Sequence, residues 1–241
     1  MLDWLRRDPR AIPTLELDGR ELPIIVRRLD RAKRMTMRLA PDGGEVRISI
    51  PKWGRTAEAL QFAASRRAWL ERQLATMPEP TSIKPGATIR YRGEPLTVRH
   101  EPTATRRPIL EGGALFVGGP ATALEPRLRR WLENEARALL ATDLAEYCVR
   151  ADKPTPRLAL SNARRRWGSC ATDGAIRINW RLIMAPDFVR RSVVAHEVAH
   201  LLHFDHSPAF HACLAGLFGG EIAAANAWLK REGRGLYQPF G

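Results

Sequence analysis

The chain has 241 residues, of which 44% are hydrophobic and 27% are charged, as in an ordinary globular protein. No stretch approaches the ~18 consecutive apolar residues of a membrane-spanning helix. The three cysteines are far apart in sequence and odd in number, which argues against a disulfide framework, and none of them forms a Cys-x-x-Cys metal clip. The net charge of +13 favours polyanionic partners such as nucleic acid, although a coding bias toward arginine would produce the same excess.

The N-terminal segment argues against secretion. Asp3 and Arg6 fall where a signal peptide would need its apolar region. We therefore expect a cytoplasmic protein that makes no contact with a membrane. Nothing in the sequence indicates an oligomeric state.

The first half of the chain has mostly strand-like patterns. Short alternating segments over residues 12–50 predict a β-meander with a hairpin turn at Asp18-Gly19. Residues 56–76 have the apolar period of one helix, and the proline-rich residues 77–86 form a connector. A second hairpin, with its turn at residues 92–94, is expected over residues 86–100.

The second half is mostly helical. Residues 123–150 carry the longest helical pattern, and strands with a turn at Asp173-Gly174 follow it. A helix is expected from Pro186-Asp187 to about Phe204, and two more lie beyond it, with no internal repeat in the chain. We predict an α+β protein with a β-rich region over residues 1–120 and a second domain over 121–241, or one continuous domain over 20–235.

The chemistry is concentrated in one predicted helix, which contains His196-Glu197-Val198-Ala199-His200. Histidines four residues apart lie on the same helix face and can bind one metal ion. Glu197 projects from the next position, where a carboxylate can take a proton from a water activated by zinc. Because every histidine except His100 lies between positions 196 and 211, unrelated surface or core histidines are the weaker explanation.

A catalytic zinc ion usually has three protein ligands, and two residues compete to be the third. His203 follows His196 by seven residues, which in a straight helix is a distance of about 10 Å along the axis. His206 reaches the metal only if the helix stops and the chain turns back. Because Ser207-Pro208 looks like the start of a new helix, we choose His206 and assign His203 to the surroundings of the site.

Three motifs in this half resemble a known family. They are Arg166-Trp167-Gly168-Ser169-Cys170, Asn179-Trp180-Arg181-Leu182, and His196-Glu197-Val198-Ala199-His200-Leu201 followed by His206-Ser207-Pro208 and Phe210. Together they resemble the YgjP-like metallopeptidase domain family, which is similar to the SprT-like and Wss-like zinc proteases. The resemblance covers roughly residues 20–235 and is densest over 157–233.

The resemblance implies a zinc metallopeptidase with His196, His200 and His206 as Zn²⁺ ligands and Glu197 as the general base. It also implies a zincin-like catalytic domain in which a small antiparallel sheet packs against the metal-binding helix. One departure is His211, where family members commonly have tryptophan. That difference affects a packing contact rather than the metal ligands.

Several roles stay open. The group that stabilises the oxyanion is one of Arg164–Arg166, Asn179 and Tyr237. Cys170 is a metal-site thiol or, as we expect for Cys148 and Cys213 too, a small buried residue. Trp167 and Trp180 are expected in the core or pocket floor.

The leading functional hypothesis is a zinc metallopeptidase acting on peptides or proteins. A DNA-associated protease that acts on crosslinked proteins is a second form, based on the basic surface and analogy with the SprT-like and Wss-like proteases. A non-enzymatic nucleic-acid-binding protein with structural zinc is a third hypothesis, although such zinc sites usually have four Cys or His ligands. A hydrolase of non-peptide amides is a fourth.

Overall fold

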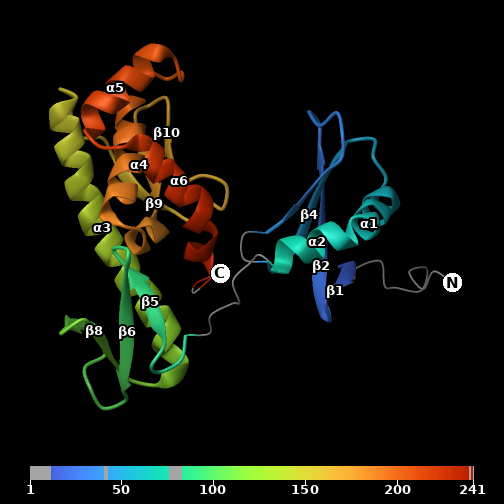
Figure 1. Cartoon of the computed structure of the whole chain (residues 1–241), viewed down its shortest axis with the longest axis horizontal. Helices are drawn as coiled ribbons and strands as arrows, with labels where there is room; N and C mark the ends of the chain where they lie inside the picture. Colours follow the sequence, from blue (N-terminus) through green and yellow to red (C-terminus); the bar gives the residue numbers. More distant parts are fainter. Residues whose placement is uncertain (1–11, 41–42, 76–82, 239, 241) are drawn as a thin grey trace. The chain divides into compact units, whose positions relative to one another are not determined.

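The chain folds into two compact units. A computed structural model describes residues 12–40, 43–75, 83–238 and 240, and the units span residues 1–79 and 80–241 (Figure 1). From the sequence we expected a division near residue 120, and the division in the structure lies well before that position. Both units combine helices with small sheets, so the predicted α+β class is confirmed.

The first unit is a four-stranded sheet with two helices. Its elements are β1 (Thr14–Leu17), β2 (Arg20–Leu29), β3 (Thr36–Leu39), β4 (Val46–Pro51), α1 (Thr56–Ser65) and α2 (Arg67–Ala75). The predicted hairpin turn is present, because Asp18 and Gly19 have φ values of 48° and 74°. Most of the connector expected over residues 77–86 lies outside the described residues.

The meander predicted for this unit is wrong. The strand order is β1-β2-β4-β3, and β2 pairs in parallel with β4. Strand β4 takes the central place because Val46, Ile48 and Ile50 are fully buried, whereas β3 is only half-buried and lies at the edge.

The single helix expected over residues 56–76 is also wrong. The chain breaks at Arg66, whose φ of −106° and ψ of 15° lie outside the helical range. The break allows Ala63 of α1 and Leu70 of α2 to be buried in the same core.

The second unit contains two sheets and four α-helices among the described residues. Its elements are β5 (Thr88–Tyr91), β6 (Glu94–Glu101), β7 (Ile109–Glu111), β8 (Ala114–Gly118), α3 (Leu124–Arg150), β9 (Leu158–Ser161), β10 (Gly168–Cys170), β11 (Ile176–Asn179), the 3-10 helix η3 (Trp180–Met184), α4 (Asp187–Ala199), α5 (Pro208–Phe218) and α6 (Ile222–Glu232).

The first sheet of this unit repeats the topology of the first unit. Its order is β5-β6-β8-β7, with β6 parallel to β8 and the outer strands antiparallel to their neighbours. The same order and orientations occur in β1-β2-β4-β3. The two sheets therefore form a structural repeat, although the sequence contains no visible internal repeat.

Helix α3 organises the second unit (Figure 1). Leu96, Val98 and Leu115 of the β5–β8 sheet share one buried core with Leu128 of α3 and Val194 of α4. This shared core explains why the boundary lies before β5 rather than near residue 120.

A three-stranded sheet, in the order β10-β11-β9, lies against α4. Because β11 is parallel to β9 and antiparallel to β10, the sheet is mixed, and the expected antiparallel sheet is wrong. Among the described residues no single helix has the length and apolar composition needed to cross a membrane; α5 and residues 222–237 pass such a test only as a pair bent by 92°.

Candidate metal centre

Three histidine side chains converge at the end of α4. The ligand atoms of His196, His200 and His206 all lie within 4.8 Å of one another. Nε2 of His196 and Nε2 of His206 are 3.3 Å apart, and two nitrogens bound ~2.1 Å from one tetrahedral zinc ion are roughly 3.4 Å apart. The spacing of this pair is therefore that of two ligands of one zinc ion, and the third imidazole lies close enough to complete a group of three.

The helix ends earlier than expected, and this end brings His206 back to the site. Helix α4 stops at Ala199 rather than near Phe204, and His200 is its C-terminal cap residue. The next turn is closed by hydrogen bonds from the backbone N–H groups of Leu202 and His203 to the carbonyl of Ala199, at 3.1 and 2.9 Å.

The same turn sets the tautomer of His200. Nδ1 of His200 lies 3.0 Å from the backbone carbonyl oxygen of His203. Because a carbonyl only accepts hydrogen bonds, Nδ1 is the protonated nitrogen and Nε2 is free to bind a metal. His203 thus contributes its backbone to the site, and its imidazole is outside the group of three.

The side chain of Phe210 packs against all three imidazoles. Its ring centroid lies 5.0, 4.6 and 4.8 Å from those of His196, His200 and His206, and Phe210 is fully buried. It is placed by the start of α5, where the side chain of Ser207 accepts a hydrogen bond from the N–H of Phe210. His211 is exposed, and its ring lies 6.4 Å from that of His206, outside the cluster.

Burial keeps the metal-facing histidine on α4 neutral. It lowers the pKa of His196 to about 4, and the neighbouring histidines act in the same direction. A neutral imidazole is the form that binds a metal ion.

The side chain of Glu197 packs against strand β10, and only 5% of the residue is exposed. A Cβ atom at position 168 would lie 2.3 Å from Oε1 of Glu197, so only glycine fits there. Burial raises the pKa of Glu197 to about 7, while the charge of Arg166 and a hydrogen bond from the backbone of Cys170 oppose that rise. The carboxylate thus lies between the metal-binding helix and β10.

Two of the five oxyanion candidates, Asn179 and Tyr237, form hydrogen bonds to the neighbouring loop. Asn179 is fully buried, and its Nδ2 donates to the carbonyl of Ala163 at 2.8 Å and to the hydroxyl of Tyr237 at 3.1 Å. The hydroxyl of Tyr237 donates to the same carbonyl at 2.9 Å. Arg166 stays available, because its side chain is exposed and its charge acts on Glu197.

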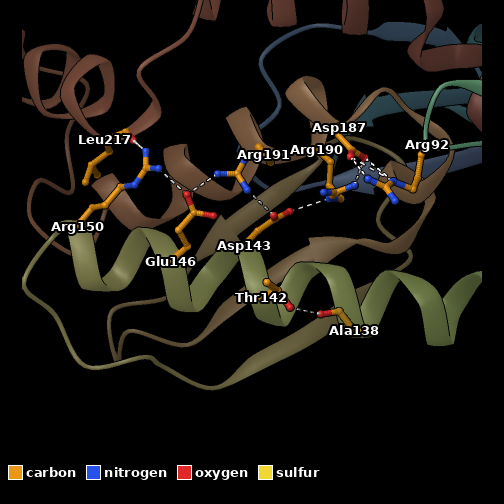
Figure 2. Close-up of polar contacts among 10 residues, drawn as sticks. All are labelled: Arg92, Ala138, Thr142, Asp143, Glu146, Arg150, Asp187, Arg190, Arg191 and Leu217. Atoms are coloured by element: carbon orange, nitrogen blue, oxygen red, sulfur yellow. Dashed lines mark hydrogen bonds and ion pairs between the residues drawn. The ribbon is translucent and has the colours of Figure 1, made fainter.

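Ion pairs hold α4 against α3 (Figure 2). Nε of Arg190 donates to Asp143 of α3 at 2.7 Å, and both side chains are almost fully buried. Arg191 bridges Asp143 at 3.1 Å and Glu146 at 2.6 Å. Asp187, at the start of α4, pairs with Arg92 in the turn between β5 and β6. The N-terminal half of the metal-binding helix is thereby tied to two other elements.

The cysteines only partly follow the expectation that all three are buried. Cys148 is buried, whereas Cys170 and Cys213 are half-buried. The thiol of Cys170 is not part of the group of ligand atoms formed by the three histidines. Trp180 is buried in the core as expected, and Trp167 packs at its edge.

The comparisons with known proteins agree with this geometry. A sequence model described as YgjP-like, metallopeptidase domain, matches residues 33–232. The chain belongs to the YgjP-like metallopeptidase family. Among curated proteins and among solved structures, no significant match is found. Membership of the YgjP-like family implies a protease, which acts on peptide or protein substrates and contains a metal ion.

Three features of this YgjP-like site were missed from the sequence. They are the contact between Gly168 and Glu197, the packing of Phe210 under the histidines, and the pairing of Asp143 with Arg190. The glycine in the Trp-Gly-Ser-Cys motif was a usable signal for the first. The third joins residues 47 positions apart, and no local pattern identifies such a pair.

Proposed function

We propose that the chain is a zinc-dependent metallopeptidase in which His196, His200 and His206 hold the metal and Glu197 is the general base. The observation that carries this proposal is the convergence of three imidazole donors beside a buried carboxylate. A bound zinc ion would polarise the scissile carbonyl and lower the pKa of a water molecule in the fourth position.

The residues around the metal position the reacting groups. The backbone carbonyl of His203 orients the imidazole of His200, and the ring of Phe210 packs against the imidazoles of all three proposed ligands. Glu197 accepts a proton at its carboxylate and donates it to the leaving amine. The positive charge of Arg166 lowers the pKa of the Glu197 carboxyl group, and we propose Arg166 as the group that stabilises the oxyanion.

Metal content tests the ligand set. The purified wild-type protein should contain about one zinc per chain by elemental analysis, in line with a three-histidine site. His206→Ala should lose this zinc. His203→Ala is the matched control, because it keeps the backbone carbonyl that orients His200. Loss of zinc from both variants, or no zinc uptake by the wild type, would contradict the ligand assignment.

Glu197→Gln separates an enzyme from a protein with structural zinc. The amide has nearly the same shape but cannot act as a base, so hydrolysis of a protein substrate such as casein should fall at least ~10²-fold. Zinc content should stay at the wild-type value. Unchanged hydrolysis in this variant would reject Glu197 as the base, and a wild type that binds zinc but hydrolyses no peptide or other amide would favour the structural role.

A further inference from the structure

A hollow of about 680 Å³ lies outside the metal centre, between the loop that follows β6 and the first turns of α3. Its lining is strongly basic. The charged and aromatic residues that matter here are Arg106, Arg107, Arg127, Arg130, Trp131 and Glu135.

The positive charge in this arginine hollow is largely uncompensated. Among the residues that the structure describes, the guanidinium groups of Arg106, Arg107 and Arg130 have no hydrogen-bond or ion-pair partner. Arg127 is held in place by donating to the carbonyl of Gly118 at 2.9 Å. The single acid, Glu135, already accepts a hydrogen bond from the hydroxyl of Tyr91 at 2.8 Å.

Stability does not account for this arrangement. Arg127 and Arg130 lie in the first two turns of α3, at the positive end of a 27-residue helix, where cationic side chains are unfavourable. Together with Arg106 and Arg107 on the facing loop, they repel one another. A bound anion would relieve both effects.

Size and chemistry narrow the kind of anion. The volume is within the range of small-ligand pockets, roughly 300–1,000 Å³. Guanidinium groups recognise phosphate through paired hydrogen bonds. Trp131 lines the same hollow beside Tyr91, their ring centroids 5.0 Å apart, and offers an apolar surface next to the cations. We propose that the arginine hollow binds the phosphate chain of a nucleotide-sized ligand.

This site is separate from the metal centre and does not rest on the proposed peptidase function. Two contacts show how the segment over residues 180–190 runs along α3. Its start meets the first half of the helix, where Arg129 lies over the ring of Trp180, and its end meets the second half, where Asp143 pairs with Arg190. The segment that leads into α4 therefore runs in the same direction as α3. Trp131 precedes Asp143 by about 18 Å along the helix axis at ~1.5 Å per residue, and the histidines lie beyond Arg190. The hollow, beside the first turns of α3, and the metal centre, beyond Arg190, therefore lie toward opposite ends of α3.

Calorimetric titration with inorganic tripolyphosphate and with ATP tests the proposal on the full chain. Both should bind with a stoichiometry of one, and adenosine alone should not bind measurably. Arg106→Gln/Arg107→Gln and Arg130→Gln change opposite walls, and each should weaken binding at least tenfold. Arg137→Gln is the matched control, because Arg137 is exposed on α3 outside the hollow, and it should bind within twofold of wild type.

Two further measurements locate the binding site and identify the class of ligand. His200→Ala should bind tripolyphosphate as the wild type does, which separates the hollow from contacts between phosphate and zinc. ATP binding more tightly than tripolyphosphate would assign a nucleotide, and equal affinities a free phosphate chain. The proposal is overturned if neither compound binds saturably, if Arg137→Gln weakens binding as much as the wall variants, or if a glutamate-rich peptide or an oligonucleotide binds while both small compounds do not.

Discussion

At the scale of single residues, the absence of one side chain shapes the candidate site. Gly168 lies on strand β10 directly against Glu197, and any Cβ atom there would overlap the carboxylate. The same strand supplies a backbone hydrogen bond to Glu197 from Cys170. A buried carboxylate held from two positions of one strand has little freedom to rotate, which suits the general base that we propose.

Gly168→Ala should therefore displace Glu197 without removing the metal ligands. We expect hydrolysis to fall about 10²-fold, because misplacement of a reacting group by about 1 Å has an effect of that size. Zinc content should stay unchanged. Gly216→Ala on α5 is the control, because a Cβ there meets no atom within 4 Å. Wild-type activity in Gly168→Ala would show that Glu197 is not held by this contact.

At the scale of elements, ion pairs as well as apolar packing fix the position of α4 on α3. Asp143 and Arg190 are 3% and 2% exposed, so the cost of removing both from water offsets much of their attraction. The net stabilisation from such a pair is small. Its main effect, we infer, is to select one alignment of α4 on α3, and this alignment places His196 and His200.

Asp143→Ala should destabilise the protein strongly, because it removes the partner of the buried Arg190 across the helix interface and leaves it only the partly exposed Asp187 on its own helix. We expect a loss of about 3–5 kcal/mol in the free energy of unfolding, measured by urea denaturation. Glu133→Ala removes a partly exposed i,i+4 pair with Arg129 on the same helix and should cost no more than about 0.5 kcal/mol. Similar losses in the two variants would rule out a special role for the buried pair.

At the scale of the whole molecule, the chain has two separate hydrophobic cores. One contains Ile48 and Leu70 of the first unit, and the other joins the β5–β8 sheet to α3 and α4. The two four-stranded sheets have the same topology, yet only the second unit continues into the histidine cluster. The proposed zinc site should therefore stabilise one core directly.

Calorimetry with and without zinc tests this independence. We expect two unfolding transitions. Zinc should raise the midpoint temperature of only the transition that belongs to residues 80–241. Ile48→Ala leaves a cavity in the first core. It should lower the free energy of unfolding of the first unit by about 2–5 kcal/mol and leave the zinc content unchanged. A single transition that responds to both changes would show that the two cores unfold as one.

Features that depend on a few neighbouring residues could be predicted from the sequence. The turns at Asp18-Gly19 and Arg92-Gly93, the start of α5 at Ser207-Pro208 and the spacing of His196 and His200 all follow from local backbone and side-chain preferences. The start of a new helix at Ser207-Pro208, just after His206, also made this histidine the better candidate for the third ligand.

The order of strands, the partners of α4 and the surroundings of Glu197 became known only from the packed structure. Strand β4 lies beside β2 because its apolar side chains compete successfully for the core, and such competition involves residues far apart in the chain. Gly168 meets Glu197, and Asp143 meets Arg190, only after sheet and helices have packed. Local patterns act over one or two turns of chain, whereas these contacts depend on which distant surfaces are buried together.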